Sequence, residues 1–490
     1  MNKPIRVMAV FCLVLFAALL VNVNVVQFVQ AEDLNAREGN RRVLDAEFSR
    51  HRGPILVDGE AIAESVESDG RFEYQRRYID PELYAPLTGF FSYTYGRSGI
   101  ERTENSILSG SDDSLFVDRL GDLLGNQQPQ GGSVELTIDA AAQKAAAAGL
   151  ADLGRGAKGA VVALDPSTGA VLAMASQPSY DPNLLASSDL ASVQASMEEL
   201  MADEDQPMLN RGTRQILPPG STFKLVTAAA ALEQLNLEPR SKVKAGRSLS
   251  FPGQTYELVN EGGSTCGGST ITLEKALNVS CNVSFGWLAD KLGQDRLAEQ
   301  AAKFGFGTEL GDQVSAVQSR FTTEGTELEQ SQLAQSGIGQ FEVAATPLQM
   351  ATVAAAIAND GEVMEPYVVK TRRAPNLSVL PGSPTEPESL GRAMSQGNAA
   401  KLRTMMESTV QEGTATSARI SGATVGGKTG TAQSTKDRPP YAWFVSYATK
   451  GDRQVAVAVV VESSRTSRSE IAGGRLAGPI ARSVMDAVIK

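Results

Sequence analysis

The chain has 490 residues, a net charge of −11 at pH 7 and a sequence pI near 5.0. This length favours two or more domains, and 42% hydrophobic with 21% charged residues is typical of a globular protein. The acidic balance argues against nucleic acid as a partner, because it repels phosphate backbones. One histidine, His51, and three cysteines do not provide the ligands of a zinc site. An all-carboxylate magnesium or calcium site stays open on this count, but we expect no metal and no other cofactor. Any catalytic base is therefore expected to be a lysine or a carboxylate.

The N-terminus carries two basic residues followed by a long apolar run. Lys3 and Arg6 precede residues 7–21, which are all apolar, and the apolar character continues to Val29. The shorter run suits a cleaved signal peptide, whereas the longer one reaches the roughly 20 residues that span a bilayer. Because Gln30-Ala31-Glu32 is a poor cleavage site, we favour a retained anchor at the plasma membrane. The basic residues predict a cytoplasmic N-terminus and an extracytoplasmic body.

Composition divides the rest of the chain into two parts. Residues 32–133 are mixed and polar and end in a Gln/Pro/Gly-rich linker at 127–133. We therefore predict three units: a cytoplasmic tip and membrane anchor at 1–31, a small mixed module with its linker at 32–133, and a large domain at 134–490.

The large domain alternates between strand and helix patterns. Asp165-Pro166-Ser167-Thr168-Gly169 is typical of a hairpin turn. Strands are predicted at 134–138, 160–164, 170–175, 426–432, 442–448 and 454–461, and helices at 140–150, through much of 221–358, and at 480–489, with Pro479 in the first turn. This order predicts an α/β fold, in which helices pack on a sheet whose outer strands come from both ends of the domain.

A serine and a lysine stand at the start of the most apolar helix. Leu217-Pro218-Pro219-Gly220 ends an extended stretch, Ser221 and Lys224 follow, and residues 225–235 are apolar nearly all round. Lys224 lies one turn from Ser221 on the same helix face. A serine hydroxyl becomes a nucleophile when a base removes its proton, and burial or a second cation keeps a lysine neutral enough for this role. A capping serine and a surface lysine are the plain alternative.

Two further motifs favour the catalytic interpretation. Ser280-Cys281-Asn282 follows a helix predicted to be capped by Thr272, and Lys428-Thr429-Gly430-Thr431 lies on a predicted strand. Another Ser-x-x-Lys match, Ser241 to Lys244, is polar and precedes no apolar helix, so we set it aside. Ser-x-x-Lys, Ser-x-Asn and Lys-Thr-Gly in this order are found in penicillin-binding proteins and class A β-lactamases.

From about residue 134 to its end, the sequence resembles the penicillin-binding transpeptidases. It resembles monofunctional class B members, and most of all the actinobacterial penicillin-binding protein A group. The resemblance implies the penicillin-binding or serine β-lactamase-like fold, with a central antiparallel sheet, helices on both faces and an all-helical subdomain. Residues 52–55 and 58–59 extend it weakly into the N-terminal module, as in class B dimerisation or pedestal modules. The other similar segments are Asn210-Arg211, 218–224, 337–340, 346–349, 413–415 and 442–444.

The same resemblance implies a reaction and a set of roles. Ser221 would form an acyl-enzyme with a peptidoglycan stem peptide ending in D-Ala-D-Ala, and an amine of a neighbouring stem would then take the acyl group. β-Lactams would acylate the same serine. Lys224 would be the base, Ser280 and Lys428 would relay a proton, and the backbone N–H groups of Ser221 and Thr431 would form the oxyanion hole. The implied substrate-binding residues are Asn282, Thr429, Gly430 and Thr431. The implied partner is a membrane glycan polymerase of the RodA/FtsW type.

Two other functions stay open from the sequence. A D,D-carboxypeptidase would use the same residues with water as the acceptor. A non-catalytic β-lactam sensor or scaffold is a weaker alternative, because about six residues precede the apolar run and leave no room for a signalling domain.

A disulfide between Cys266 and Cys281 is the last expectation. Both cysteines lie in the predicted exported part, an oxidising setting, and Gly267-Gly268 between them lets the chain turn. Two buried, reduced thiols are the alternative.

Overall fold

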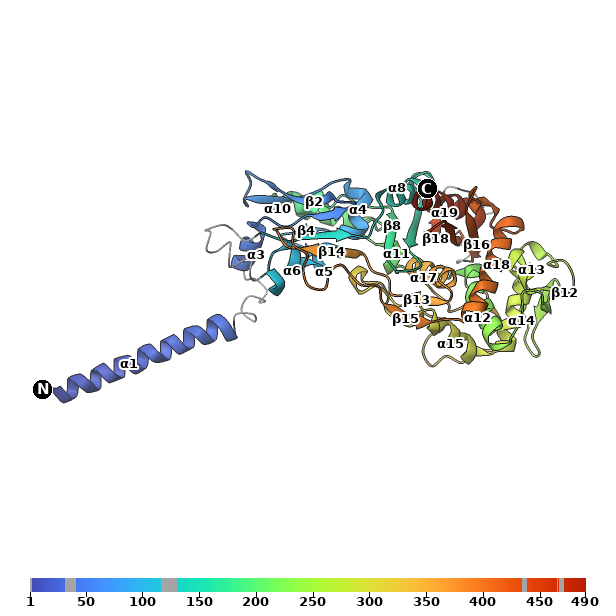
Figure 1. Cartoon of the computed structure of the whole chain (residues 1–490), viewed down its shortest axis with the longest axis horizontal. Helices are drawn as coiled ribbons and strands as arrows, with labels where there is room; N and C mark the ends of the chain where they lie inside the picture. The colour runs from blue at the N-terminus through green and yellow to red at the C-terminus, as the bar shows by residue number, and fades with distance from the viewer. Residues whose placement is uncertain (1, 31–40, 116–129, 434–438, 465, 467–470) are drawn as a thin grey trace.

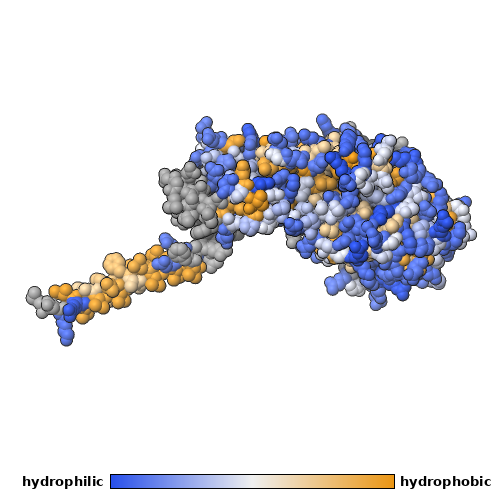
Figure 2. Space-filling view, in the orientation of Figure 1, coloured by the Kyte–Doolittle hydropathy of each residue, from blue (hydrophilic) through white to orange (hydrophobic). Residues whose placement is uncertain are grey.

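In the computed structural model of the chain, residues 2–30, 41–115, 130–433, 439–464, 466 and 471–490 are described. The N-terminal module and the large domain form an elongated body, and helix α1 (Asn2–Asn24) stands apart from it as a rod (Figure 1). The most apolar 18-residue stretch within residues 3–27 has a mean hydropathy of 2.6 and none of it is buried, and Figure 2 shows this rod as predominantly hydrophobic. The rod is thus a candidate membrane anchor. Ala31 and the start of the predicted linker, residues 127–129, lie outside the described residues.

The large domain is built on a five-stranded antiparallel sheet in the order β16-β17-β18-β7-β8. Its outer strands, β8 and β16, come from the two ends of the domain, as predicted. Helices α8 (Ala140–Ala151) and α19 (Gly473–Ile489) cover one face, and α17 (Pro347–Ala358) packs on the same strands in the other part of the core. The strands are β16 (Thr424–Ala432), β17 (Tyr441–Lys450), β18 (Arg453–Ser463), β7 (Lys158–Leu164) and β8 (Val171–Gln177).

The hairpin between β7 and β8 forms where its turn residues predict it. Asp165 Oδ1 accepts a hydrogen bond from the Ser167 backbone N–H at 2.8 Å, and the Asp165 N–H donates to Ala170 O at 2.8 Å. Gly169 has a φ of +82°, a left-handed conformation that glycine adopts without strain.

Beyond one end of this sheet lies a helical region that carries the Ser221–Lys224 and Ser280–Asn282 motifs, whereas Lys428–Thr431 lies on β16. Helix α12 is apolar nearly all round and is buried among the neighbouring helices. The main helices here are α12 (Lys224–Gln234), α13 (Leu273–Asn278), α14 (Asn282–Leu292), α15 (Gln294–Lys303), α16 (Gln330–Ser336) and α18 (Gln396–Glu412). Two-stranded ribbons accompany them, β9 (Lys242–Lys244) with β12 (Thr270–Thr272), β10 (Ser248–Ser250) with β11 (Glu257–Val259), and β13 (Glu362–Met364) with β15 (Ser389–Arg392).

A second five-stranded sheet links the N-terminal module to the large domain. Its order is β14 (Val369–Arg373), β6 (Ser133–Leu136), β1 (Ile55–Val57), β2 (Glu60–Glu67) and β3 (Tyr74–Tyr78). Strand β6 pairs in parallel with β1, so the predicted strand at 134–138 belongs to this sheet and not to the central one. The other elements of the module are α3 (Arg41–Phe48), α4 (Pro81–Thr88), β4 (Phe91–Ser92), β5 (Gly96–Arg97), α5 (Gly99–Thr103) and α6 (Asn105–Leu108). The large domain also contains the helices α9 (Asn183–Ala186), α10 (Leu190–Ala202) and α11 (Arg211–Arg214).

The C-terminal helix is longer than the sequence pattern predicts. Helix α19 begins at Gly473, so Pro479 lies inside the helix and not in its first turn. The extra turns pack so closely that a Cβ at Gly473 would lie 2.0 Å from Trp443 O and 2.6 Å from Gly430 O. Because residue 473 is a glycine, the first turn of α19 can pack closely against β16. This packing compensates for the helix-breaking tendency of Pro479.

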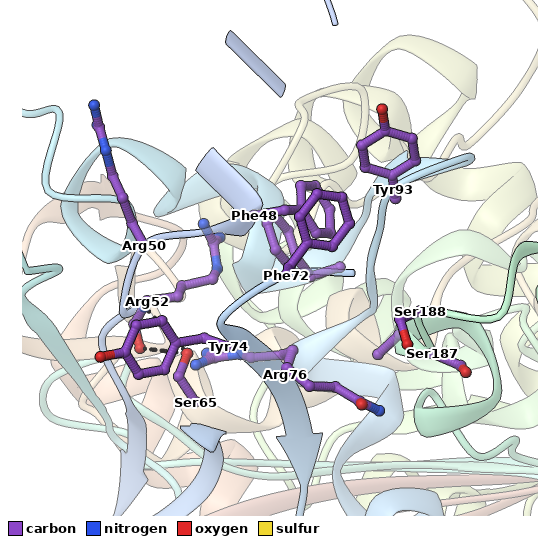
Figure 3. A pocket seen from close by; sticks show the side chains of 13 residues that line it. Phe48, Arg50, Arg52, Ser65, Phe72, Tyr74, Arg76, Tyr93, Ser187 and Ser188 are labelled. Atoms are coloured by element: carbon purple, nitrogen blue, oxygen red, sulfur yellow. Dashed lines mark hydrogen bonds between the residues drawn. The ribbon is translucent and has the colours of Figure 1, made fainter. Parts of the chain in front are cut away.

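A buried charge network holds the core of the N-terminal module. Glu101 is fully buried, and its carboxylate accepts hydrogen bonds at 2.6 Å from both Arg52 Nε and Arg76 Nε and at 3.1 Å from the Tyr78 hydroxyl. Burial raises the pKa of the Glu101 carboxyl, but the two guanidinium groups outweigh it and hold this pKa below its ordinary value. Figure 3 shows Arg52 and Arg76 near the aromatic side chains of Phe48 and Phe72. The ring of Phe48 also stacks on that of Phe91, with 4.2 Å between the centroids.

This network predicts a large stability loss when its carboxylate is removed. Glu101→Gln leaves the buried guanidinium of Arg76 without its counter-charge and that of Arg52 with Glu47 alone, and we expect a loss of about 3–5 kcal/mol in unfolding free energy. Thermal unfolding of the detergent-solubilised chain measures this effect. Glu64→Gln, which breaks the exposed pair with Arg77, is the matched control with an expected change below about 1 kcal/mol. Equal, small changes in the two variants would contradict the role given to Glu101.

Candidate active site

The predicted nucleophile stands in a tight turn at the start of α12. Ser221 lies in a single 3₁₀ turn, Gly220–Thr222, directly before the helix. Gly220 has a φ of +53°, and its N–H donates to Gly339 O at 2.9 Å. Because a Cβ at Gly339 would lie 2.2 Å from Gly220 O, both glycines are needed to bring these two segments together.

Lys224 follows one turn later, as the first residue of α12, and is fully buried. Its Nζ donates to Ser280 O at 2.8 Å, to Ser280 Oγ at 3.2 Å and to Asn282 Oδ1 at 2.7 Å. Burial and the nearby Lys428 ammonium lower the pKa of Lys224 well below its ordinary value, while Glu261 opposes them. The surroundings of Lys224 therefore favour the neutral form that a base requires.

Ser280 joins this lysine to the one on the edge strand of the sheet. Lys428 Nζ donates to Ser280 Oγ at 2.9 Å and to Thr429 O at 2.7 Å. Burial lowers the pKa of Lys428 to about 7, against the raising effect of Glu261. The Ser280 hydroxyl thus lies between two buried amines that lose their protons more readily than lysines in water, which suits it to pass a proton in either direction.

The segment that carries Ser280 and Asn282 is held from several sides. Thr272 caps α13 as predicted, because its hydroxyl accepts from the Lys275 backbone N–H at 3.1 Å. Ser280 has a φ of +56°, and Asn282 begins α14 and donates through Nδ2 to Val259 O at 2.9 Å. A disulfide joins Cys266 to Cys281, with a Cα–Cα distance of 5.9 Å, and fastens the preceding loop to this corner.

The Lys-Thr-Gly strand forms the opposite wall. Gly430 packs so closely that a Cβ there would lie 2.9 Å from Thr222 Cγ2 and 3.0 Å from Pro219 O. Thr429 Oγ1 lies 2.8 Å from Thr414 Oγ1. The structure thus brings together Ser221, Lys224, Ser280, Asn282, Lys428, Thr429, Gly430 and Thr431 from α12, the α13–α14 corner and β16.

Two cavities open at Ser221. The larger has a volume of about 460 Å³, and Asn282, Thr431 and Gln340 line it; the smaller, of about 70 Å³, is lined by Ser280, Thr429 and Thr414. Both are also lined by Glu261. Sequence reasoning missed Glu261 and the contact of Thr414 with Thr429, because no spacing connects these residues to the three motifs.

The two residues that the sequence analysis set aside lie elsewhere. Ser241 Oγ accepts a local hydrogen bond from Glu238 N at 2.9 Å, and Lys244 is exposed on β9. His51 lies in the N-terminal module, edge-on to Tyr74 at 5.3 Å between ring centroids. Among the described residues, no group of three or more His, Cys, Asp or Glu side chains is arranged to hold a metal ion.

Comparison with known proteins places the chain in a family. The penicillin binding protein transpeptidase domain matches residues 159–486, and the penicillin binding protein A dimerisation domain matches residues 52–134. The chain therefore belongs to the penicillin-binding protein transpeptidases, and it has the class B domain combination.

Its full length resembles the penicillin-binding protein A group. The peptidoglycan D,D-transpeptidases PbpA of Mycolicibacterium smegmatis and Mycobacterium tuberculosis are 42% and 40% identical to it, and both matches cover 100% of this chain and 99% of the relative. The ceftriaxone acyl-enzyme structure of penicillin-binding protein A from M. tuberculosis matches with a TM-score of 0.86 at 39% identity, covering 91% of this chain and 100% of that one. The protein is a serine-type peptidoglycan D,D-transpeptidase that acts in cell wall synthesis and is acylated by β-lactams.

The disulfide beside the site gives a direct prediction. Thiol titration of the denatured, unreduced chain should find one free thiol, Cys12, whereas three free thiols would contradict the bridge. Cys266→Ala should lower the melting temperature, since closing a 15-residue loop stabilises by about 3 kcal/mol on the chain-entropy model. The variant should still be acylated by penicillin, because neither sulfur takes part in the chemistry.

Proposed function

We propose that Ser221 is the nucleophile and Lys224 its general base. The observation that supports this assignment most is the burial of Lys224 against Ser280 and Asn282, one helical turn after Ser221. A neutral Lys224 takes the proton of the Ser221 hydroxyl as its Oγ attacks the carbonyl of the penultimate D-Ala. The terminal D-Ala leaves as its amine takes up a proton that Ser280 passes on from the lysine pair.

The developing oxyanion is stabilised by two backbone donors, the N–H groups of Ser221 and Thr431. Both residues line the larger cavity, and Ser221 stands at the N-terminal end of α12, where helix N–H groups point toward incoming negative charge. Thr429 and Thr431 receive the donor carboxylate, and Asn282 holds the amide side of the donor peptide. The donor peptide lies along this strand, and glycine at position 430 lets the strand pack against Thr222 in the turn that carries Ser221.

The second half of the reaction regenerates the serine. An amine from a neighbouring stem attacks the acyl-enzyme, the new amide bond forms, and the bond from the acyl carbon to Ser221 Oγ breaks. Lys224 returns a proton to Ser221. By microscopic reversibility, Ser280 and Lys428 take a proton from the incoming amine, just as they gave one to the leaving amine. Water in place of the amine gives the D,D-carboxypeptidase outcome, so the ratio of cross-link to free acid measures how far hydrolysis competes.

The setting of this site follows from the anchor. We propose that the N-terminus lies in the cytoplasm and the body outside, because Lys3 and Arg6 flank the short side of the apolar helix. The predicted units, residues 1–31, 32–133 and 134–490, would then be the anchor, a docking module and the catalytic domain. A membrane glycan polymerase of the RodA/FtsW type is the proposed partner. Protease treatment of intact spheroplasts should remove the catalytic domain, and protection of that domain would refute this topology.

The nucleophile is tested by its smallest substitution. Ser221→Ala should abolish covalent labelling by fluorescent penicillin without unfolding the chain, because one hydroxyl is lost and the turn is kept. Ser241→Ala, in the second Ser-x-x-Lys match, is the matched control and should label like the wild type. Stoichiometric labelling of Ser221→Ala would refute the assignment.

The base is tested by a substitution that keeps the charge. Arginine stays protonated at working pH, so Lys224→Arg should slow acylation by about 10²–10⁴-fold, the usual size of a lost general base. Lys244→Arg, at the equivalent position of the second motif, should leave the acylation rate unchanged. Stopped-flow acylation with a chromogenic cephalosporin measures both, and circular dichroism verifies folding. Near wild-type acylation of Lys224→Arg would mean that Lys224 has a structural role alone.

A further inference from the structure

One acidic residue stands over a site that is otherwise built from lysines and neutral groups. Glu261 lines both cavities that open at Ser221, and it is the one charged side chain among the described residues that line them. Its side chain is exposed, and the described part of the chain offers it no ion-pair partner within 4.0 Å. A carboxylate at the mouth of a reaction cleft, with no such partner among the described residues, is therefore available to a ligand.

The backbone that carries Glu261 is fixed to the catalytic corner. Asn260 is buried, and its Nδ2 donates to Gly246 O at 2.7 Å and to Ser264 O at 2.8 Å. Its Oδ1 accepts from the Val283 N–H at 3.0 Å, in the first turn of α14. Glu261 therefore follows directly on a residue that is held in place by hydrogen bonds. These bonds fix the backbone at Glu261 close to α14, the helix that begins with Asn282.

The turn also leaves space beside the carboxylate. Gly262 and Gly263 follow Glu261 with φ values of +64° and +67°, and a Cβ at either would meet nothing within 4 Å. A substrate group can therefore approach Glu261 from the cavity side. The negative charge of Glu261 also acts on the two lysines of the site. It raises the pKa of both Lys224 and Lys428, whereas burial, the larger effect, lowers both pKa values.

The reaction supplies a ligand of matching charge. The acceptor is a primary amine, which is an ammonium in solution near neutral pH, whereas the donor ends in a carboxylate that Glu261 repels. We propose that Glu261 is the residue that binds the acceptor: its carboxylate holds the acceptor ammonium in the larger cavity, facing the acyl-enzyme, and disfavours entry of a second donor end. The proposal depends on Ser221 carrying the acyl group, as proposed above.

The proton balance is compatible with this role. Of the three protons on the acceptor ammonium nitrogen, one remains on the new amide, one ends on Ser221 Oγ as the ester bond breaks, and one is released. Because Glu261 is exposed, the released proton has a direct route to water at the point where the ammonium is held. The carboxylate concentrates the acceptor and orients it, and the lysine pair carries out the proton transfer to the serine.

The test separates the acceptor from the donor half of the reaction. The full-length protein in detergent is given an N-acylated D-alanyl thioester as the donor, and products are counted as hydrolysed acid or as transfer to an added nucleophile. D-Alaninamide is the cationic acceptor and methanol the neutral one. Three proteins are compared: the wild type, Glu261→Gln, and Glu324→Gln as the control, which removes an exposed charge that lines neither cavity.

We expect Glu261→Gln to lower the transfer-to-hydrolysis ratio with D-alaninamide by about 1.5–5-fold, the range for one exposed charge pair. The loss should appear as a higher KM for the acceptor, and the methanol ratio should not change. Added salt should lower the D-alaninamide ratio in the wild type and in Glu324→Gln, and should have little effect in Glu261→Gln. An unchanged D-alaninamide ratio, or an equal loss with methanol, would overturn the proposal.

Penicillin labelling reports separately on the site itself. Acylation requires no acceptor, and loss of Glu261 removes an influence that favours protonated lysines, so Glu261→Gln should still be labelled. If the wild type were labelled at a residue other than Ser221, the proposed chemistry would fail, whatever the acceptor ratios. If labelling at Ser221 is normal in both proteins but the acceptor ratios do not differ, the role of Glu261 alone is wrong.

Discussion

Two lysine side chains buried beside one serine hydroxyl are the constraint on which the active site depends. Lys224 and Lys428 both reach Ser280 Oγ, at 3.2 Å and 2.9 Å, and both are fully buried. Two ammonium groups in such a place would repel each other and lose their hydration, so at least one amine is driven toward the neutral form. This electrostatic cost is the physical basis for the role that we propose for Lys224, the general base for Ser221.

The rest of the fold serves to hold this unfavourable arrangement in place. Lys224 is fixed by α12, which is buried among helices, and Lys428 by β16, whose neighbour β17 is buried along most of its length. Ser280 sits in a left-handed conformation between α13 and α14, next to the Cys266–Cys281 disulfide. Packing of Gly473 behind Gly430 closes the back of the strand. The strain and the desolvation at the site are thus offset by well-packed elements around it.

The motif residues could be predicted because each motif lies within a short segment, whose spacing and neighbouring residues can be read directly from the sequence. Ser221 and Lys224 are related by one helical turn, Thr272 marks the cap of α13, and Lys428 to Thr431 alternate as a strand. Features that depend on contacts across the chain could not be predicted in this way. Glu261 lines the cavities because its turn is held in place by the hydrogen bond of Asn260 to α14. Strand β6 pairs with β1, which lies nearly 80 residues earlier in the chain. The start of α19 was mispredicted because the packing of Gly473 decides it, and not the proline rule.

The N-terminal module has its own buried charge centre. Glu101 satisfies Arg52 and Arg76, and Arg372 on β14 donates to Glu104 at 2.6 Å and 2.7 Å. Because β14 and β6 share one sheet with β1, the module and the large domain are joined by backbone pairing and by the Arg372–Glu104 ion pair. The two parts therefore share one continuous sheet.

The pH dependence of acylation in a Lys428→Met variant tests the central claim most directly. If the ammonium of Lys428 helps to keep Lys224 neutral, removing it raises the pKa of Lys224, and the residual acylation rate should rise with pH along a limb displaced to higher pH than in the wild type. Measurement with a chromogenic cephalosporin over a range of pH, for both proteins, gives this displacement. An acid limb that stays in place, or moves to lower pH, would contradict the account of a base made neutral by its buried neighbour.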